Sequence, residues 1–370
     1  MKRQLWKIFG LPAIVAATVQ AQPKVVLSGP ATCRECRIEL ERVITLGDAK
    51  GPGLLQEQSS VATDRRGRFY LSSNYDPTVV VFDARGRFLR KLGRTGPGPG
   101  EFSSRVAMLI GPGDSLYAIE LGGNRMSLFS PNYAWVRTSS LALTPSTAVH
   151  APDVGFLFSG ALRFADGIGH PVHVVDRNGA HIRSFGSATG EQDLYSRLEG
   201  LRRMTAPRGQ IFWTSRVDAY VLEQWNLEGR KLAQLTRHVS WFPPDVKMPR
   251  GSNYTTHAPP PYMIGITEDS AGLVWTLAQV ADRDWKPLRE LLPSPSGTQN
   301  RATPDSVRHK IWDSVLEVID PARGVVLVEQ RFDTKFQEFI APNLLVSFDE
   351  DADGNPRYVV WRARLVSPSK

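Results

Sequence analysis

Residues 61–102 read VATDRRGRFYLSSNYDPTVVVFDARGRFLRKLGRTGPGPGEF, and this stretch has the pattern of one complete β-sheet unit. Four runs rich in β-branched and aromatic residues alternate with turn-forming residues. The tight hairpin turns between them need residues with positive φ, which Gly67 and Gly86 supply. The stretch therefore predicts a four-stranded antiparallel meander, the shape of one β-propeller blade. The four runs are Ser60–Thr63, Arg68–Ser72, Thr78–Phe82 and Arg87–Leu92.

The hairpin at the end of this unit recurs along the chain. It consists of an apolar run, Asp or Asn, a turn with Gly, and a second alternating run. Clear copies are VVVFDARGRFLRKLG (79–93), VHVVDRNGAHIRSFG (172–186) and LEQWNLEGRKLAQL (222–235), with looser ones at 126–141 and 315–330. The equivalent residues Phe82, Phe129, Val175 and Trp225 are 47, 46 and 50 residues apart. This spacing is typical of propeller blades.

A second pattern gives the number of blades. Hairpins of first and second strands are expected at six places, and five complete outer hairpins accompany them. Residues 38–47, IELERVITLG, resemble a fourth strand without a preceding turn and supply the sixth. We expect an all-β fold, a six-bladed propeller of four-stranded antiparallel blades, closed by the N-terminal strand joining the last blade. The six hairpins are expected at 61–73, 106–120, 149–160, 201–215, 262–279 and 343–365.

The pattern resembles the NHL-repeat six-bladed propellers of exported bacterial proteins. The resemblance rests on the connector GRTGPGPGEF (93–102) and on ELGGNR (120–125), which precedes a third strand. It extends over the mature chain and is closest in the first two blades. Related propellers include lactonase-like hydrolases, which hold calcium or zinc at the centre of the ring, and lyases. The resemblance therefore implies an enzyme as one alternative.

The N-terminus has the features of an export signal. Basic residues precede an apolar stretch, 8–19, that is too short to span a bilayer, and Val19-Gln20-Ala21 suits signal-peptidase cleavage. We expect cleavage near Ala21, a periplasmic or extracellular location, and no stable membrane span in the mature chain. A retained anchor helix is the alternative. The expected parts are a signal peptide (1–21), an N-terminal segment (22–37), the propeller (38–366) and a tail (367–370).

Cys33 and Cys36 are the two cysteines of the chain, in ATCRECR. Because exported proteins meet oxidising conditions, a local disulfide is the preferred interpretation. Covalent haem attachment would need His after the second Cys, where Arg37 stands. A thioredoxin-like centre, a zinc site with ligands from elsewhere and an intermolecular bridge are the remaining alternatives.

The charge balance is moderately basic. The net charge of +8 falls to +5 when the three basic residues of the expected signal peptide are removed. This excess and the lack of a recognisable motif argue against nucleic-acid binding. An anionic ligand is compatible with the same balance.

Two long insertions, 238–261 and 282–310, are expected on the face that carries the second-to-third loops and the connectors between blades. They contain many prolines and several aromatic residues, so they predict a lid or recognition surface, with plain surface decoration as the alternative. Their flat contact surface would come from Trp241, Tyr254, His257, Tyr262 and Trp285.

Residues just ahead of each inner strand should ring the mouth of the central tunnel on that face. They comprise two arginines, one imidazole and no carboxylate, which disfavours a metal ion and suits an anionic group. Pairing of each arginine with a nearby acid is the competing interpretation. The predicted ring is Ser60, Arg105, His150, Arg203, Tyr262 and Asn343; Arg125, Arg163, Arg216 and Asp218 are expected near the same face.

Asp349, Asp351 and Asp353 imitate the alternating acids of a calcium loop, but the terminal Glu is missing. They are expected in a first-to-second turn on the opposite face.

These observations favour a binding or scaffold module over an enzyme. Its insertion-bearing face would contact a protein, a peptide, a glycan or another anionic partner, without a cofactor. The alternative is a metal-dependent lactonase-like hydrolase or an NHL-type lyase with its site at the tunnel mouth, and only that alternative implies calcium or zinc. No nucleophile elbow or catalytic triad is recognisable.

Overall fold

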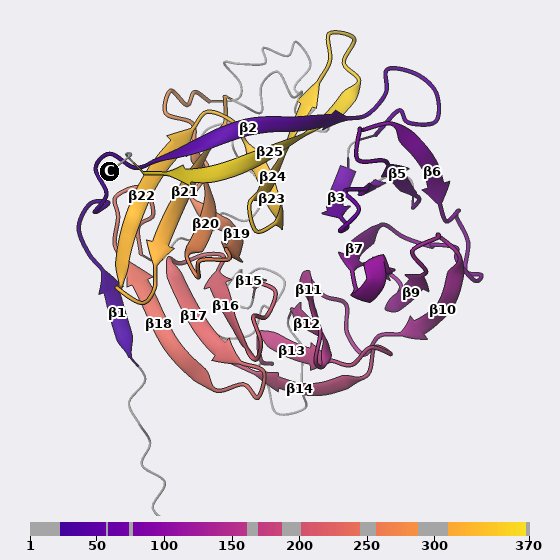
Figure 1. The fold of residues 1–370 in the computed structure, drawn as a ribbon, viewed down its shortest axis with the longest axis horizontal. Helices are drawn as coiled ribbons and strands as arrows, with labels where there is room; N and C mark the ends of the chain where they lie inside the picture. The colour runs from indigo at the N-terminus through magenta and orange to yellow at the C-terminus, as the bar shows by residue number, and fades with distance from the viewer. Residues whose placement is uncertain are drawn as a thin grey trace, which may run out of the picture.

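The computed structural model describes residues 23–56, 58–73, 77–160, 169–186, 201–244, 257–287 and 310–367. Within them the chain forms strands and one short 3-10 helix, Pro112–Asp114. The strands make six sheets arranged as blades around a centre (Figure 1). The prediction of an all-β, six-bladed propeller is confirmed.

Each blade is an antiparallel sheet whose first strand lies nearest the centre (Figure 1). Blades 1 to 3 consist of β3 (Gln58–Thr63), β4 (Phe69–Ser73), β5 (Val79–Phe82), β6 (Phe88–Leu92); β7 (Val106–Ile110), β8 (Leu116–Glu120), β9 (Arg125–Phe129), β10 (Trp135–Ser140); and β11 (Thr147–Ala151), β12 (Gly155–Ser159), β13 (Val172–Val175), β14 (His181–Phe185). Blades 4 and 5 consist of β15 (Arg202–Met204), β16 (Ile211–Arg216), β17 (Val221–Asn226), β18 (Lys231–Arg237); and β19 (Tyr262–Glu268), β20 (Val274–Ala281), β21 (Trp312–Asp320), β22 (Val325–Phe332). Blade 6 consists of β23 (Phe336–Ala341), β24 (Leu344–Glu350), β25 (Pro356–Val366) and β2 (Arg37–Leu46).

The N-terminal strand β2 closes the ring. It pairs with β25 in antiparallel register from Arg37 opposite Val366 to Leu46 opposite Tyr358. Ile38 and Leu46 are 2% and 0% exposed, so β2 contributes to the core as well as to the ladder. The predicted closure is confirmed, and it joins the two ends of the chain in one sheet.

The segment before β2 crosses the outer edges of blades 4 and 5. Strand β1 (Lys24–Leu27) adds to β18 in parallel, at the rim of the disc (Figure 1). The backbone N–H groups of Thr32 and Cys33 then donate to Val326 and Leu327 of β22, at 2.8 and 3.1 Å. A disulfide joins Cys33 to Cys36, whose Cα atoms are 5.3 Å apart. Strand β1 was not predicted from the sequence.

The inner strand of blade 6 differs from the prediction. Residues 343–365 were expected to form its first and second strands, but they contain the second and third, β24 and β25, and the inner strand is β23. The physical reason is that β23 has register shifts on both sides of Glu338–Phe339, which break the alternation of a regular strand. Its turn to β24, Pro342-Asn343, also lacks the glycine that marks other hairpins.

This shift moves two predicted features to the other face. Asn343 lies in the β23–β24 turn, where its carbonyl accepts a hydrogen bond from the Ala363 N–H at 2.9 Å, so it is not a mouth residue. The acidic turn at 349–353 joins β24 to β25, on the face that carries the connectors. There Asp351 accepts hydrogen bonds from the backbone N–H groups of Asp353 and Asn355, as turn-forming aspartates do.

The hydrophobic core lies between neighbouring blades. The core between blades 1 and 2, for example, contains Tyr70, Val81, Leu116 and Phe102. Phe102 ends the connector and is 0% exposed. Its ring lies against Gly93, where a Cβ would be 2.3 Å from it, so glycine is required for this close approach.

Candidate functional site

A cavity of about 500 Å³ opens among the N-terminal ends of the inner strands. We call it the mouth pocket. Three of the residues predicted at the mouth, Arg105, Arg203 and Tyr262, line it. The other lining residues are Thr147, Ala148, Val149, Met204, Ile264, Gly265, Ile266, Gln279, Lys335, Gln337, Glu338 and Phe339.

Arg203 is the most unusual polar group of the mouth pocket. It is the middle residue of β15 and is half-buried. Its Nε is buried without a hydrogen-bond partner among the described residues, and no ion pair joins it to any of them. Burial lowers the pKa of Arg203, with Glu338 and Tyr262 opposing that shift. The guanidinium stays protonated, so a positive charge with donors to spare faces the cavity.

Glu338 is the carboxylate of the pocket lining. The register shift beside Gln337 lets Gln337, Glu338 and Phe339 all line the cavity, whereas a regular strand would turn every second side chain away. Glu338 Oε1 accepts a hydrogen bond from the Val61 N–H of β3 at 3.0 Å. Burial raises the pKa of Glu338 to about 7, although Val61 and Arg203 oppose the shift.

Tyr262 and Lys335 are positioned by aromatic and polar contacts. The Tyr262 hydroxyl donates to Gln279 Oε1, and Gln279 Nε2 donates to the Phe336 carbonyl at 2.9 Å. The Tyr262 ring meets the Trp312 ring edge-on at 5.2 Å, and Lys335 Nζ lies 5.8 Å from the centre of the same indole. These contacts connect blade 5 to the start of blade 6 and hold both side chains beside the cavity.

Gly265 allows two inner strands to approach in the wall of the pocket. A Cβ at this position would lie 2.8 Å from Phe339 Cδ2. Any larger residue would therefore displace the Phe339 ring and change the shape of the cavity.

The charges of the mouth pocket favour an anion. Arg105, Arg203 and Lys335 supply three positive charges, against the single carboxylate of Glu338 among the described lining residues. A cluster of like charges in a cavity attracts an ion of opposite sign.

His150 lies away from this pocket. It was expected just before an inner strand, but β11 already begins at Thr147, so His150 is at the far end of the strand, opposite Phe156. Burial lowers the pKa of His150, and Arg177 and Arg65, from turns on the opposite face, lower it further. The predicted start of this strand, at residue 149, is two residues too late.

Arg125, Arg216 and Asp218 have partners within the protein. Arg216 donates through Nε and Nη2 to Asp218 at 3.1 and 3.0 Å. Arg125 donates to Glu120 Oε1 at 2.8 Å and to the Pro97 carbonyl at 2.6 Å. Arg125, Arg216 and Asp218 are therefore engaged in contacts within their own blade or its connector.

The insertions are described only at their ends. Trp241 packs edge-on against Tyr220 and Phe242, with ring centres 6.0 and 5.8 Å apart. Trp285 is half-buried and His257 is exposed. Arg163 and Tyr254 lie outside the described residues.

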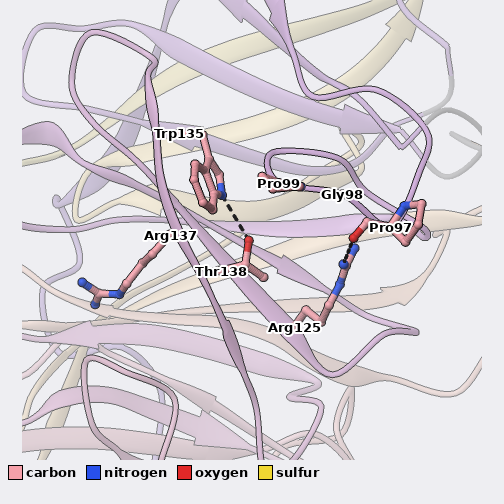
Figure 2. A pocket seen from close by; sticks show the side chains of 7 residues that line it. All are labelled: Pro97, Gly98, Pro99, Arg125, Trp135, Arg137 and Thr138. Atoms are coloured by element: carbon pink, nitrogen blue, oxygen red, sulfur yellow. Dashed lines mark hydrogen bonds between the residues drawn. The ribbon is translucent and has the colours of Figure 1, made fainter.

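A second, smaller cavity of about 290 Å³ lies at the outer part of blade 2. Figure 2 shows Trp135 and Thr138 on one side of it and the Pro97–Pro99 connector on the other. Its cations are already engaged, because Arg125 bonds to Pro97 (Figure 2) and Arg137 Nη2 donates to the Arg177 carbonyl at 2.9 Å. The mouth pocket is therefore the stronger candidate for a charged ligand.

Within the ranges that the structure describes, no three His, Cys, Asp or Glu side chains gather closely enough to hold a metal ion. In the same ranges no helix has the length and apolar composition needed to cross a membrane.

Comparison with known proteins supports the fold. A family model described as a 6-bladed beta-propeller matches residues 53–199. A candidate exported protein from Bacteroides fragilis has a similar structure, with a TM-score of 0.58 and 8% identity over 92% of this chain and 99% of its own. A member of the duf4221 family from Bacteroides vulgatus gives a TM-score of 0.57 and 10% identity, over 90% and 99%. At these identities the likeness shows the fold alone.

A virginiamycin B lyase from Staphylococcus aureus matches more weakly, with a TM-score of 0.44 and 8% identity over 88% of this chain and 99% of its own. That level of likeness does not bear on the activity of the present chain. No curated protein matches the sequence.

Two residues of the mouth pocket, Glu338 and Lys335, were missed by the sequence analysis. Both precede or belong to β23, the inner strand that was assigned to other residues. The recurrent spacing of the blades offered a signal, because an inner strand is due shortly after the outer hairpin at 315–330.

Proposed function

We propose that this chain is an exported propeller that binds a carboxylate-bearing ligand in the mouth pocket. The observation that carries the proposal is Arg203, a half-buried guanidinium at the cavity with no hydrogen-bond or ion-pair partner among the described residues. Export rests on the N-terminal sequence, a basic start followed by a short apolar stretch and a cleavage site at Ala21.

A carboxylate suits the pocket better than a more highly charged anion. Arginine presents a planar fork of donors that matches the two oxygens of a carboxylate. Glu338 already places one acidic group in the lining, so a dianion would meet stronger repulsion than a monoanion. The cavity of about 500 Å³ lies within the range of small-ligand sites and holds one sugar ring or one amino-acid residue.

Two sources of such a group are an acidic glycan and an acidic peptide, the partners that the insertion-bearing face would contact. Isothermal titration with D-glucuronate and with the α-amide of N-acetyl-L-glutamate, each of which carries a single carboxylate, represents the two sources. D-glucose and N-acetyl-L-glutamine amide are the neutral counterparts.

We expect at least one of the acids to bind and its neutral counterpart to bind at least tenfold more weakly, the equivalent of about 1.4 kcal/mol. Arg203→Gln should abolish the difference between acid and neutral compound. The matched control is Arg183→Gln, since Arg183 is an exposed arginine of the outer strand β14. Failure of both acids to bind the wild-type protein would contradict the proposal.

Acid–base catalysis at the same pocket is the second candidate function, because a carboxyl group with a pKa of about 7 in a cavity is suited to it. This candidate corresponds to the lactonase-like or lyase alternative. Turnover of lactones and esters by wild-type protein, lost in Glu338→Gln, would support it, and elemental analysis of protein purified without chelators would show whether calcium or zinc takes part. Binding of the acids without turnover would favour the binding module.

A further inference from the structure

We propose that Glu338 takes up one proton when an anion enters the mouth pocket, so that ligand binding is coupled to pH. This inference rests on the proposed function and adds its regulation.

Binding of an acidic ligand would bring a second acidic group into the cavity that Glu338 lines. Glu338 lines the pocket together with Arg203, and a ligand carboxylate held by Arg203 would share the cavity of about 500 Å³ with it. When two carboxylates share a site, the pKa of one of them rises strongly, because the second negative charge is repelled. The ligand is the stronger acid, with an ordinary pKa below 4.5, so Glu338 is the group that accepts the proton.

The contacts of Glu338 leave one oxygen available for that proton. Oε1 accepts the Val61 N–H, and no hydrogen bond to Oε2 is formed by the described residues. A proton from solvent on Oε2 would turn it into a donor that faces the cavity. The neutral carboxyl group could then donate a charge-assisted hydrogen bond to the ligand carboxylate.

The charged and titratable groups around Glu338 support this assignment. They are Arg203 from β15, Tyr262 from β19, Arg105 ahead of β7 and Lys335 ahead of β23. None of these groups is a carboxylate, so Glu338 is the one acidic side chain among the described lining residues. Burial already raises the pKa of Glu338 to about 7 before any ligand is added, so little further change is needed.

The test is titration of D-glucuronate and the α-amide of N-acetyl-L-glutamate into the mature chain at pH 7, in imidazole and in bis-tris at equal ionic strength. The two buffers differ in ionisation enthalpy, so the difference in binding heat counts the protons exchanged. We expect an uptake of about half a proton per ligand at pH 7, and affinity about tenfold weaker at pH 8 than at pH 6. Glu338→Gln keeps an oxygen for Val61 and should bind with no proton uptake and no pH dependence.

His150→Gln is the control, because His150 is a titratable residue of an inner strand that lies away from the mouth pocket. This variant should retain the proton uptake. The number of protons that the wild-type protein takes up per bound ligand tests the inference even if the Glu338→Gln variant does not fold. Binding with no proton exchange and constant affinity would overturn the inference and leave the proposed function standing. If neither acid binds, the proposed function itself fails and the inference fails with it.

Discussion

Glu338 Oε1 and the Val61 N–H form a hydrogen bond of 3.0 Å that joins the inner strand of the last blade to that of the first. This bond lies in the wall of the mouth pocket, where Glu338 also faces the ligand cavity. The same carboxyl group therefore has a structural contact through one oxygen and a free position for chemistry at the other.

The structural contact predicts a difference between two substitutions. Glu338→Leu leaves the Val61 N–H without an acceptor, whereas Glu338→Gln retains one. We expect the leucine variant to be less stable than the glutamine variant by about 1–3 kcal/mol, the penalty of an unsatisfied buried donor. Urea denaturation of both variants at pH 7 measures the difference, and equal midpoints with equal slopes would show that the bond contributes nothing.

The raised pKa of Glu338 predicts how stability depends on pH. Between its ordinary value of 4.5 and about 7, the folded protein keeps a proton that the unfolded chain has released. The contribution of this group to the free energy of unfolding therefore falls as the pH rises through that window, and becomes constant above it.

The fall should be about 1–2 kcal/mol, less than the full shift implies because water reaches the pocket. The measurement is the stability difference between wild type and Glu338→Gln at pH 5 and pH 8. The stability of Glu338→Gln relative to the wild type should be higher at pH 8 than at pH 5. A difference that does not change with pH would mean that Glu338 titrates at its ordinary value.

Two residues of the closing strand β2 differ in burial, so substitutions at them should differ in their effect on stability. Leu46 is 0% exposed and Val43 is 38% exposed. Leu46→Ala should lower the free energy of unfolding by about 2–5 kcal/mol through the loss of buried surface and the cavity left behind. Val43→Ala should change it by less than about 0.5 kcal/mol. Similar losses of stability for the two variants would show that the burial of Leu46 is not what makes β2 stabilise the closed ring.

The sequence shows much of the architecture because turns and alternation are local properties. In blade 1, Gly67 and Gly86 adopt positive φ, at 74° and 75°, in the turns that were predicted for them. The closure by residues 38–47 could also be predicted, since the fourth strand of the last blade had no other source.

The site was less predictable, for two physical reasons. The bulged strand β23 has no clean alternation, so its residues Lys335 and Glu338 were not assigned to the mouth. His150 was placed there because the predicted strand start, at residue 149, is two residues too late; β11 begins at Thr147 and has five residues, so His150 lies toward its other end. Arg105, Arg203 and Tyr262 lie at strand starts that were predicted to within one residue, and these three line the pocket.

Gly265 gives a prediction that connects the wall of the pocket to binding. A Cβ there would meet Phe339 at 2.8 Å, so Gly265→Ala should displace the ring, lower stability by about 1–3 kcal/mol and weaken binding of the acidic ligand. Gly160→Ala is the control, because its Cβ would meet no atom closer than 3.5 Å. Paired titration and denaturation measure both effects, and unchanged binding would show that this wall does not touch the ligand.

The most direct measurement is the position of a bound carboxylate in crystals soaked with 4-bromobenzoate, whose bromine is located by anomalous scattering. We predict a bromine peak in the mouth pocket, with the carboxylate within hydrogen-bond distance of Arg203 and of Glu338 Oε2. Loss of the peak in Arg203→Gln crystals would complete the result. A peak at the Pro97–Trp135 cavity instead, or none at the mouth, would contradict the proposal that a carboxylate binds in the mouth pocket at Arg203.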